Sequence, residues 1–338
     1  MNRPKAIVIG ISGKNLKKVE AALITRVTPF GVIIFKRNIS SFFQLKKLVA
    51  DIRNCSSNDI AIFIDQEGGR VQRLSGGYWP KYPPASVFGD IAKYSLPRAI
   101  EAVKLNYSLI ADDLLNLGIN VNCCPCLDLY FENGDQIIGD RSFSADPNIV
   151  YSLGKEVCSS MMSRGVFPVI KHIPGHGRAD VDSHKDLPII NEDISILKKS
   201  DFFPFKKLNN VPFGMTSHIL YTSMDTKEPV TFSYKIYKFI REQLNFKGIL
   251  ISDDIEMSAL SGSLKYRAEK VINSGYDLVL YCKGNHEHNE LLLNILPKVS
   301  EDTWYKWKNY NKNNKISINF DKKESINRLK YLVKNIYI

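Results

Sequence analysis

Short apolar runs alternate with amphipathic stretches along the chain. Eight runs are apolar on both faces and rich in β-branched residues, which predicts buried strands at 6–11, 31–35, 60–64, 118–122, 166–170, 211–216, 248–252 and 277–281. Apolar residues that return every three or four positions predict helices at 44–54, 97–117, 149–163, 234–244 and 264–274, with two more at 287–296 and 322–334. Strands that are buried on both faces and alternate with helices indicate a parallel sheet covered by helices.

Eight strand–helix units favour one architecture within the α/β class. A (β/α)8 TIM barrel closes with eight strands, whereas an open doubly wound sheet has no fixed number of strands. The length of 338 residues also suits a barrel. No linker rich in Pro, Gly and Ser divides the chain, and the nearest approach, at 76–84, fits a loop at the rim of an active site. We therefore predict a single barrel domain over residues 1–338.

Composition narrows the class of protein and its partners. An apolar content of 44% and a charged content of 24% are typical of a globular protein. The net charge of +11 would suit an acidic partner, but Lys and Asn are spread along the chain, most densely at 306–315, and no nucleic-acid motif accompanies them. We expect no nucleic-acid partner.

Neither a membrane segment nor a signal peptide is predicted. No apolar run approaches the roughly 18 residues that a membrane span needs, and the apolar run near the start is too short for a signal peptide. We therefore expect a cytoplasmic monomer without a membrane partner. Cys123, Cys124 and Cys126 share one apolar segment without a second ligand pair at metal spacing, so we interpret them as strand packing in a reducing compartment.

Polar residues directly follow five of the predicted strands, at the end where barrel enzymes build their sites. They are Asp65 to Arg73 after the third strand, Asn122 and Asp128 after the fourth, Lys171 and His172 after the fifth, Ser217 and His218 after the sixth, and Asp253 and Asp254 after the seventh. The fifth strand leads into a glycine-rich turn, so that three of the six histidines, His172, His176 and His184, lie within thirteen residues. This density indicates a site rather than a structural loop.

The types of residue suit carbohydrate chemistry. Asp253 at a strand end is well placed to attack an anomeric carbon, and Asp182 can orient or charge His184. Arginines donate paired hydrogen bonds and carboxylates accept from sugar hydroxyls. We also expect Tyr78 and Trp79 to line the mouth of the site. The stretch 10–13 lacks the glycine pattern of phosphate-binding loops, and we expect no cofactor.

These motifs resemble those of the family 3 glycoside hydrolases, specifically the single-domain bacterial β-N-acetylglucosaminidases of peptidoglycan recycling. The matching segments are 65–73, 139–143, 171–177, 182–184 and 252–254, in the order of the family. The resemblance implies that Asp253 is the nucleophile of a retaining exo-hydrolysis and that His184, paired with Asp182, is the general acid/base. It also implies that five residues hold the N-acetylglucosamine ring: Asp65, Arg73, Arg141, Lys171 and His172.

The implied substrate is a muropeptide fragment, N-acetylglucosamine β-linked to a 1,6-anhydro-N-acetylmuramoyl group with or without peptide. This substrate would connect the protein to cell-wall biogenesis, cell shape, the cell cycle and cell division, without cofactor or metal. The chain departs from the family at Ile173, where we expect Phe, and at the cysteines of 123–126, where we expect Ala, Pro and Val types. We interpret both as packing positions.

Three alternatives remain to be compared with the structure. A metal-dependent barrel hydrolase could use His172, His176, His184 and Asp253, although Lys171 would place a positive charge beside the ion. A non-catalytic sugar-binding protein would not need Asp253 and the Asp182–His184 pair. A phosphorylase stays open, since a histidine acid/base leaves room for an anionic acceptor. The glycines at 175 and 177 predict that the loop carrying His184 is mobile.

Overall fold

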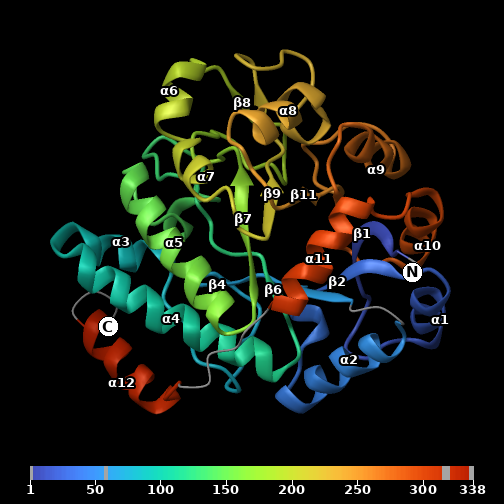
Figure 1. The fold of residues 1–338 in the computed structure, drawn as a ribbon, viewed down its shortest axis with the longest axis horizontal. Helices are drawn as coiled ribbons and strands as arrows, with labels where there is room; N and C mark the ends of the chain where they lie inside the picture. The colour runs from blue at the N-terminus through green and yellow to red at the C-terminus, as the bar shows by residue number, and fades with distance from the viewer. Residues whose placement is uncertain (1–2, 57–59, 314–319, 335–338) are drawn as a thin grey trace.

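Eight parallel strands close into a barrel, as predicted. The computed structural model describes residues 3–56, 60–313 and 320–334. The strands are β1 (Lys5–Gly10), β2 (Pro29–Ile34), β3 (Ala61–Ile64), β6 (Val121–Asn122), β7 (Phe167–Ile173), β9 (Phe213–Thr216), β11 (Ile249–Asp254) and β12 (Leu278–Tyr281). They are hydrogen-bonded in the order β1-β12-β11-β9-β7-β6-β3-β2, and the helices lie around them (Figure 1). Each strand overlaps a predicted run, which confirms the (β/α)8 fold class.

The predicted helices are also present. They are α2 (Phe42–Asn54), α4 (Leu96–Asn116), α5 (Pro147–Ser163), α8 (Tyr234–Glu242), α9 (Leu264–Asn273), α10 (His286–Ile295) and α12 (Lys322–Val333). Side-chain caps begin several of them: Ser95 accepts from the backbone of Arg98, and Asp146 accepts from Asn148 in front of α5. The helix α12 packs on the outside of α4.

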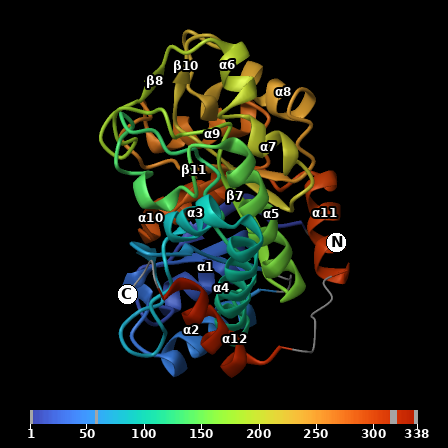
Figure 2. The same cartoon turned by 90° about the vertical axis from the view of Figure 1, so that its left-hand side faces the viewer.

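Several further elements were not predicted. They are the helices α1 (Lys18–Arg26), α3 (Ala85–Tyr94), α6 (Ile194–Lys199), α7 (Phe203–Lys207) and α11 (Glu301–Asn313), the 3-10 turns η1 (Lys36–Asn38), η2 (Gly139–Arg141) and η3 (Val230–Phe232), and the strand pairs β4 (Gln66–Gly68) with β5 (Val71–Gln72) and β8 (Ile189–Ile190) with β10 (Leu220–Tyr221). Figure 2 shows β8 and β10 beside α6. The 3-10 turns and the strand pairs, with two or three residues in each element, are too short for a period to stand out in the sequence.

The helix α11 seals the end of the barrel where the strands begin. The sequence suggested only a Lys- and Asn-rich composition here, but Trp304 and Trp307 lie on one face and are buried. The ring of Trp307 lies 5.4 Å from that of Phe30, 5.5 Å from Phe167 and 5.9 Å from Phe213. Because these phenylalanines stand at the starts of β2, β7 and β9, α11 leaves the opposite end of the barrel as the open one.

Two apolar layers enclose the sheet. One fills the barrel interior, with side chains such as Val8, Phe63, Val169 and Ile251, and the other lies between the strands and the helices. Cys123 belongs to the inner layer and Cys124 to the outer one, so both pack as predicted. All six cysteines are free. Within the described ranges, no helix combines the length and the apolar character that crossing a membrane requires.

Candidate active site

Side chains from several strand ends meet in one cavity at the open end of the barrel. The cavity has a volume of about 290 Å³. Seven of the eight predicted site residues line it: Asp65, Arg73, Arg141, Lys171, His172, His184 and Asp253. The eighth, Asp182, contacts His184 from outside the cavity. The strand ends deliver these residues to one place because parallel strands of a barrel all finish at the same end.

Five of the charged residues form one continuous chain of ion pairs. The Nζ atom of Lys171 lies 3.0 Å from Asp65 Oδ1 and 2.6 Å from Glu67 Oε1. Arg73 Nη2 contacts Asp65 Oδ2 at 3.0 Å. Arg141 donates two hydrogen bonds to Glu67, from Nε at 3.0 Å and from Nη2 at 2.9 Å. Alternating charges therefore hold one another in fixed positions around the cavity.

The ion pairs keep their members charged. Burial acts to raise the pKa of Asp65, but Lys171 and Arg73 hold it well below its usual range. Burial likewise acts to raise the pKa of Glu67, but Arg141 and Lys171 lower it to about 2. For Lys171 burial acts to lower the pKa, and Asp65 and Glu67 raise it above its ordinary value. All of these groups are ionised at neutral pH.

Sequence reasoning gave Glu67 no role. It stands two positions after Asp65, in the short strand β4, and both carboxylates contact Lys171. Gly68 next to it has a φ of 105°, and a Cβ there would lie 2.3 Å from the carbonyl oxygen of Pro83. The acidic residue and the glycine in one motif were the available signal, but only the fold shows which cations Glu67 holds.

Asp253 is the last residue but one of β11 and lies beside two histidines. Its Oδ2 atom lies 4.0 Å from His172 Nε2, and its Oδ1 accepts a hydrogen bond of 2.8 Å from the backbone of Asp254. Burial acts to raise the pKa of Asp253, but the neighbouring imidazoles of His172 and His218 and the hydrogen bond from the backbone of Asp254 lower it below its ordinary value. The side chain is 19% exposed, so an ionised carboxylate faces the cavity.

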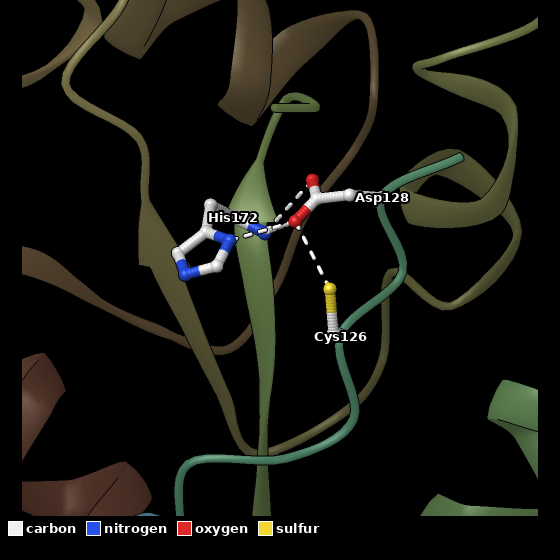
Figure 3. Close-up of side chains that lie close together, drawn as sticks. All are labelled: Cys126, Asp128 and His172. Atoms are coloured by element: carbon white, nitrogen blue, oxygen red, sulfur yellow. Dashed lines mark hydrogen bonds and ion pairs between the residues drawn. The ribbon is translucent and has the colours of Figure 1, made fainter. Parts of the chain in front are cut away.

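Asp128 contacts the ring nitrogen of His172 that faces away from Asp253. It is fully buried, and its Oδ2 lies 2.7 Å from His172 Nδ1 and 3.1 Å from the sulfur of Cys126 (Figure 3). Its Oδ1 accepts a hydrogen bond of 2.7 Å from the backbone of His176. With Nδ1 engaged by Asp128, the other ring nitrogen of His172 faces Asp253. The sequence placed Asp128 after a strand but assigned it no function.

The histidines of the metal-hydrolase alternative face different partners. Nδ1 of His172 faces Asp128, and Nε2 of His176 lies 3.2 Å from Ser183 Oγ. Burial lowers the pKa of His176 to about 4, so that ring is neutral. In the described part of the chain, the potential ligand atoms of Cys126, Asp128 and His172 lie within 4.8 Å of one another. Hydrogen bonds to Asp128 already join these three side chains (Figure 3). The set that the alternative requires is not brought together.

His184 stands at the rim on the loop that follows β7. Its ring Nδ1 lies 2.8 Å from Asp182 Oδ1, which also accepts the backbone N–H of His184 at 2.9 Å. Burial acts to raise the pKa of Asp182, but these hydrogen bonds lower it. The backbone oxygen of Ser183 accepts from Ala259, and Arg178 pairs with Asp201, so the loop is anchored at two points. The predicted pairing is present, and the mobility of the loop stays a prediction.

The prediction that Tyr78 and Trp79 line the mouth of the site is wrong. Trp79 is buried in the layer between the strands and the helices, Tyr78 is exposed, and neither lines the cavity. The large apolar surface of Trp79 is removed from water by core packing instead. Apolar side chains from the strands and their loops line the cavity: Ile33, Phe35, Val71, Ile137, Met215, Met257 and Leu280.

A second cavity of about 370 Å³ adjoins the first. His184 and Asp254 line both. Burial, together with the neighbouring charge of Asp253, raises the pKa of Asp254 to about 6. Arg37 brings a positive charge to the second cavity and donates to the backbone oxygens of Ile11 and Cys282 rather than to a carboxylate.

Comparison with known proteins identifies the family. Residues 4–303 match the family described as the glycosyl hydrolase family 3 N terminal domain. A beta-hexosaminidase of Nitrosomonas eutropha is 32% identical over 294 residues, which cover 86% of this chain and 84% of that protein.

Solved structures agree with the sequence match. Native NagZ from Neisseria gonorrhoeae superimposes with a TM-score of 0.89 at 28% identity, over 98% of both chains. The same protein in complex with N-trifluoroacetyl-D-glucosamine gives the same TM-score of 0.89, identity of 28% and coverage of 98%. The chain therefore belongs to glycosyl hydrolase family 3 and is a glycoside hydrolase.

Proposed function

We propose that the protein is a retaining exo-β-N-acetylglucosaminidase that releases N-acetylglucosamine from peptidoglycan fragments. One observation carries the proposal: the ionised Asp253, the Asp182–His184 pair and the chain of ion pairs surround the same cavity. Support for the sugar comes from the beta-hexosaminidases that the chain resembles and from the relative with a bound glucosamine derivative.

Asp253 is the proposed nucleophile. Asp253 and Asp254 line the cavity without a Lys or Arg partner among the described residues, whereas Asp65 and Glu67 are each held by two cations. Asp254 is the weaker candidate, because its pKa is raised to about 6 and its Oδ1 already accepts from the backbone of Glu256 and Cys282. A carboxylate without a tight cation keeps its lone pairs available for the anomeric carbon. The lowered pKa of Asp253 keeps it ionised at neutral pH.

His184 is the proposed acid/base. In the first step it protonates the leaving oxygen, and in the second it takes a proton from the attacking water. Asp182 fixes the ring by its bond to Nδ1, so Nε2 is left for the substrate. The exposed position, with 63% of the side chain accessible, admits water for the second step.

The remaining predicted residues hold the sugar ring. Asp65 is proposed to accept from two hydroxyls, and Arg73, Arg141, Lys171 and His172 to donate to or orient the others. The cavity of about 290 Å³ is slightly smaller than the range of about 300–1,000 Å³ for ligand pockets, which suits one ring at the end of a substrate. An exo action follows from this size.

The second cavity is the proposed site of the leaving group. His184 borders both cavities, and an acid that protonates the leaving oxygen must stand between the sugar and its leaving group. The charge of Arg37 would attract the carboxylates of a muropeptide. We accordingly place the activity in cytoplasmic peptidoglycan recycling and expect it in a monomer.

Release of p-nitrophenol from its β-N-acetylglucosaminide tests the proposal. The wild type should hydrolyse this compound and, faster, the anhydromuramoyl disaccharide with its peptide, while Asp253→Asn should be inactive on both. The β-glucoside is the control substrate. Added phosphate should leave the rate and the product unchanged, since a glycosyl phosphate product would favour the phosphorylase alternative. EDTA should also leave the rate unchanged, because no step is assigned to an ion.

A further inference from the structure

Cys126 shares an acceptor oxygen with a histidine of the active site. Its sulfur lies 3.1 Å from Asp128 Oδ2, and His172 Nδ1 lies 2.7 Å from the same oxygen (Figure 3). The other oxygen, Oδ1, is occupied by the backbone N–H of His176 at 2.7 Å and that of His172 at 3.2 Å. Among the described residues, the donors to this carboxylate are therefore Cys126, His172 and His176.

The thiol is the donor in this contact. An ionised carboxylate only accepts hydrogen bonds, so the hydrogen between the sulfur and Asp128 belongs to Cys126. Burial, together with the charge of Asp128, raises the pKa of the Cys126 thiol well above its ordinary value, so the S–H group persists at neutral pH. Cys126 and Asp128 are 3% and 0% exposed, which leaves the thiol no water as an alternative partner.

The position of the thiol has a mechanical consequence. Asp128 Oδ2 accepts from Cys126 on one side and from His172 on the other, so the carboxylate group is restrained against rotation about its Cβ–Cγ bond. A restrained carboxylate fixes the tautomer and the plane of the imidazole ring that it holds. The ring of His172 in turn directs Nε2 toward Asp253, 4.0 Å away.

We propose that Cys126 is a positioning residue of the active site, whose thiol orients Asp128 and, through it, the ring of His172 beside the sugar and Asp253. The part of this inference that concerns the sugar rests on the proposed function. The positioning of His172 rests on the contacts alone. Cys123 packs in the apolar interior of the barrel, whereas Cys126 contributes to Asp128 a hydrogen bond that an apolar residue of similar size lacks.

Two variants at this position separate the hydrogen bond from the volume. Cys126→Val keeps a similar volume and removes the donor, whereas Cys126→Ser keeps a donor. Cys158→Val is the matched control, because Cys158 is also buried, at 2% exposure, in α5 and outside the site. The measurements are kcat and KM for the p-nitrophenyl β-N-acetylglucosaminide, and the ¹⁵N-edited NMR signal of the His172 Nδ1–H group.

In Cys126→Val, kcat/KM should fall about three- to tenfold, the typical effect of one hydrogen bond, and the Nδ1–H signal should shift. Cys126→Ser should stay within about twofold of wild type and keep the signal near its position. Cys158→Val should change neither measurement even if it lowers the melting temperature.

The inference is overturned if Cys126→Val leaves the rate and the NMR signal unchanged, or if Cys126→Ser behaves like Cys126→Val. It is equally overturned if Cys158→Val produces the same loss. A wild type that hydrolyses no β-N-acetylglucosaminide would contradict the proposed function instead, and the NMR signals of the three variants would still decide the role of Cys126.

Discussion

The guanidinium group of Arg141 donates two parallel hydrogen bonds to the carboxylate of Glu67, at 3.0 and 2.9 Å, across a sequence separation of 74 residues. Both side chains are nearly buried, with 10% and 7% exposed. Glu67 also contacts Lys171 at 2.6 Å. The carboxylate of Glu67 thus holds Arg141 and Lys171, two of the cations that we propose to contact the sugar.

Glu67→Gln should destabilise the protein by about 3–5 kcal/mol, because it leaves two buried cations short of a negative charge. Urea unfolding followed by circular dichroism measures the change. Asp140→Asn is the control, since Asp140 pairs with Arg70 at the surface, with 41% and 42% of the side chains exposed, and its loss should cost about 1 kcal/mol or less. Equal losses in the two variants would contradict the role given to Glu67.

Protonation of Glu67 at acid pH should lower the free energy of unfolding. The pKa of Glu67 falls from the ordinary 4.5 to about 2 on folding, so the unfolded chain binds its proton more readily than the folded one. The stabilisation that the ionised Glu67 contributes is complete above about pH 4.5 and is lost as the pH falls toward about 2. Over this range the unfolding free energy of the wild type should decline more steeply than that of Glu67→Gln. Parallel curves would show that Glu67 has an ordinary pKa.

A fluorinated slow substrate should label Asp253. In a retaining mechanism the nucleophile forms a covalent glycosyl-enzyme, which a fluorinated sugar hydrolyses slowly enough to trap. Peptide mapping by mass spectrometry should find the sugar on Asp253, and NMR should show a first product that retains the β configuration. A label on Asp254 or Glu67, or an inverted product, would refute the assignment.

The defect of His184→Ala should depend on the leaving group. For the anhydromuramoyl disaccharide the first step should slow by about 10²- to 10⁴-fold, because its leaving oxygen needs a proton. A dinitrophenyl glycoside needs none and should react in that step at nearly the wild-type rate. Asp182→Asn should show the same pattern more mildly, since the imidazole remains. Equal defects for both substrates would make His184 a group that positions substrate.

Trp307→Ala should cost about 3–5 kcal/mol of stability while sparing the site geometry. The ring is fully buried at the closed end of the barrel, opposite the cavity. Tyr305→Ala, on the exposed face of the same helix with 71% of the residue accessible, should change stability by less than about 0.5 kcal/mol. Thermal unfolding of the two variants compares them directly, and similar melting temperatures would contradict the sealing role of α11.

The sequence by itself determined the barrel and the list of residues that reach its open end. The eight apolar runs are local patterns, and their alternation with helices predicts a parallel barrel whatever the distant partners are. Asp65, Lys171 and Asp253 could be placed at one end of the barrel without coordinates, because every strand of such a barrel finishes there.

Tertiary structure alone decided which of these side chains touch. Lys171 meets Asp65 and Glu67 over about a hundred residues of sequence, through β7 and β3, which β6 separates in the sheet. Asp128 meets His172 because the segment after β6 passes beside the end of β7. Periodicity reports which face of an element is buried, but it carries no information on the partner across the barrel. Trp79 and α11 were misjudged for this reason, since burial by distant segments decides the place of an aromatic ring.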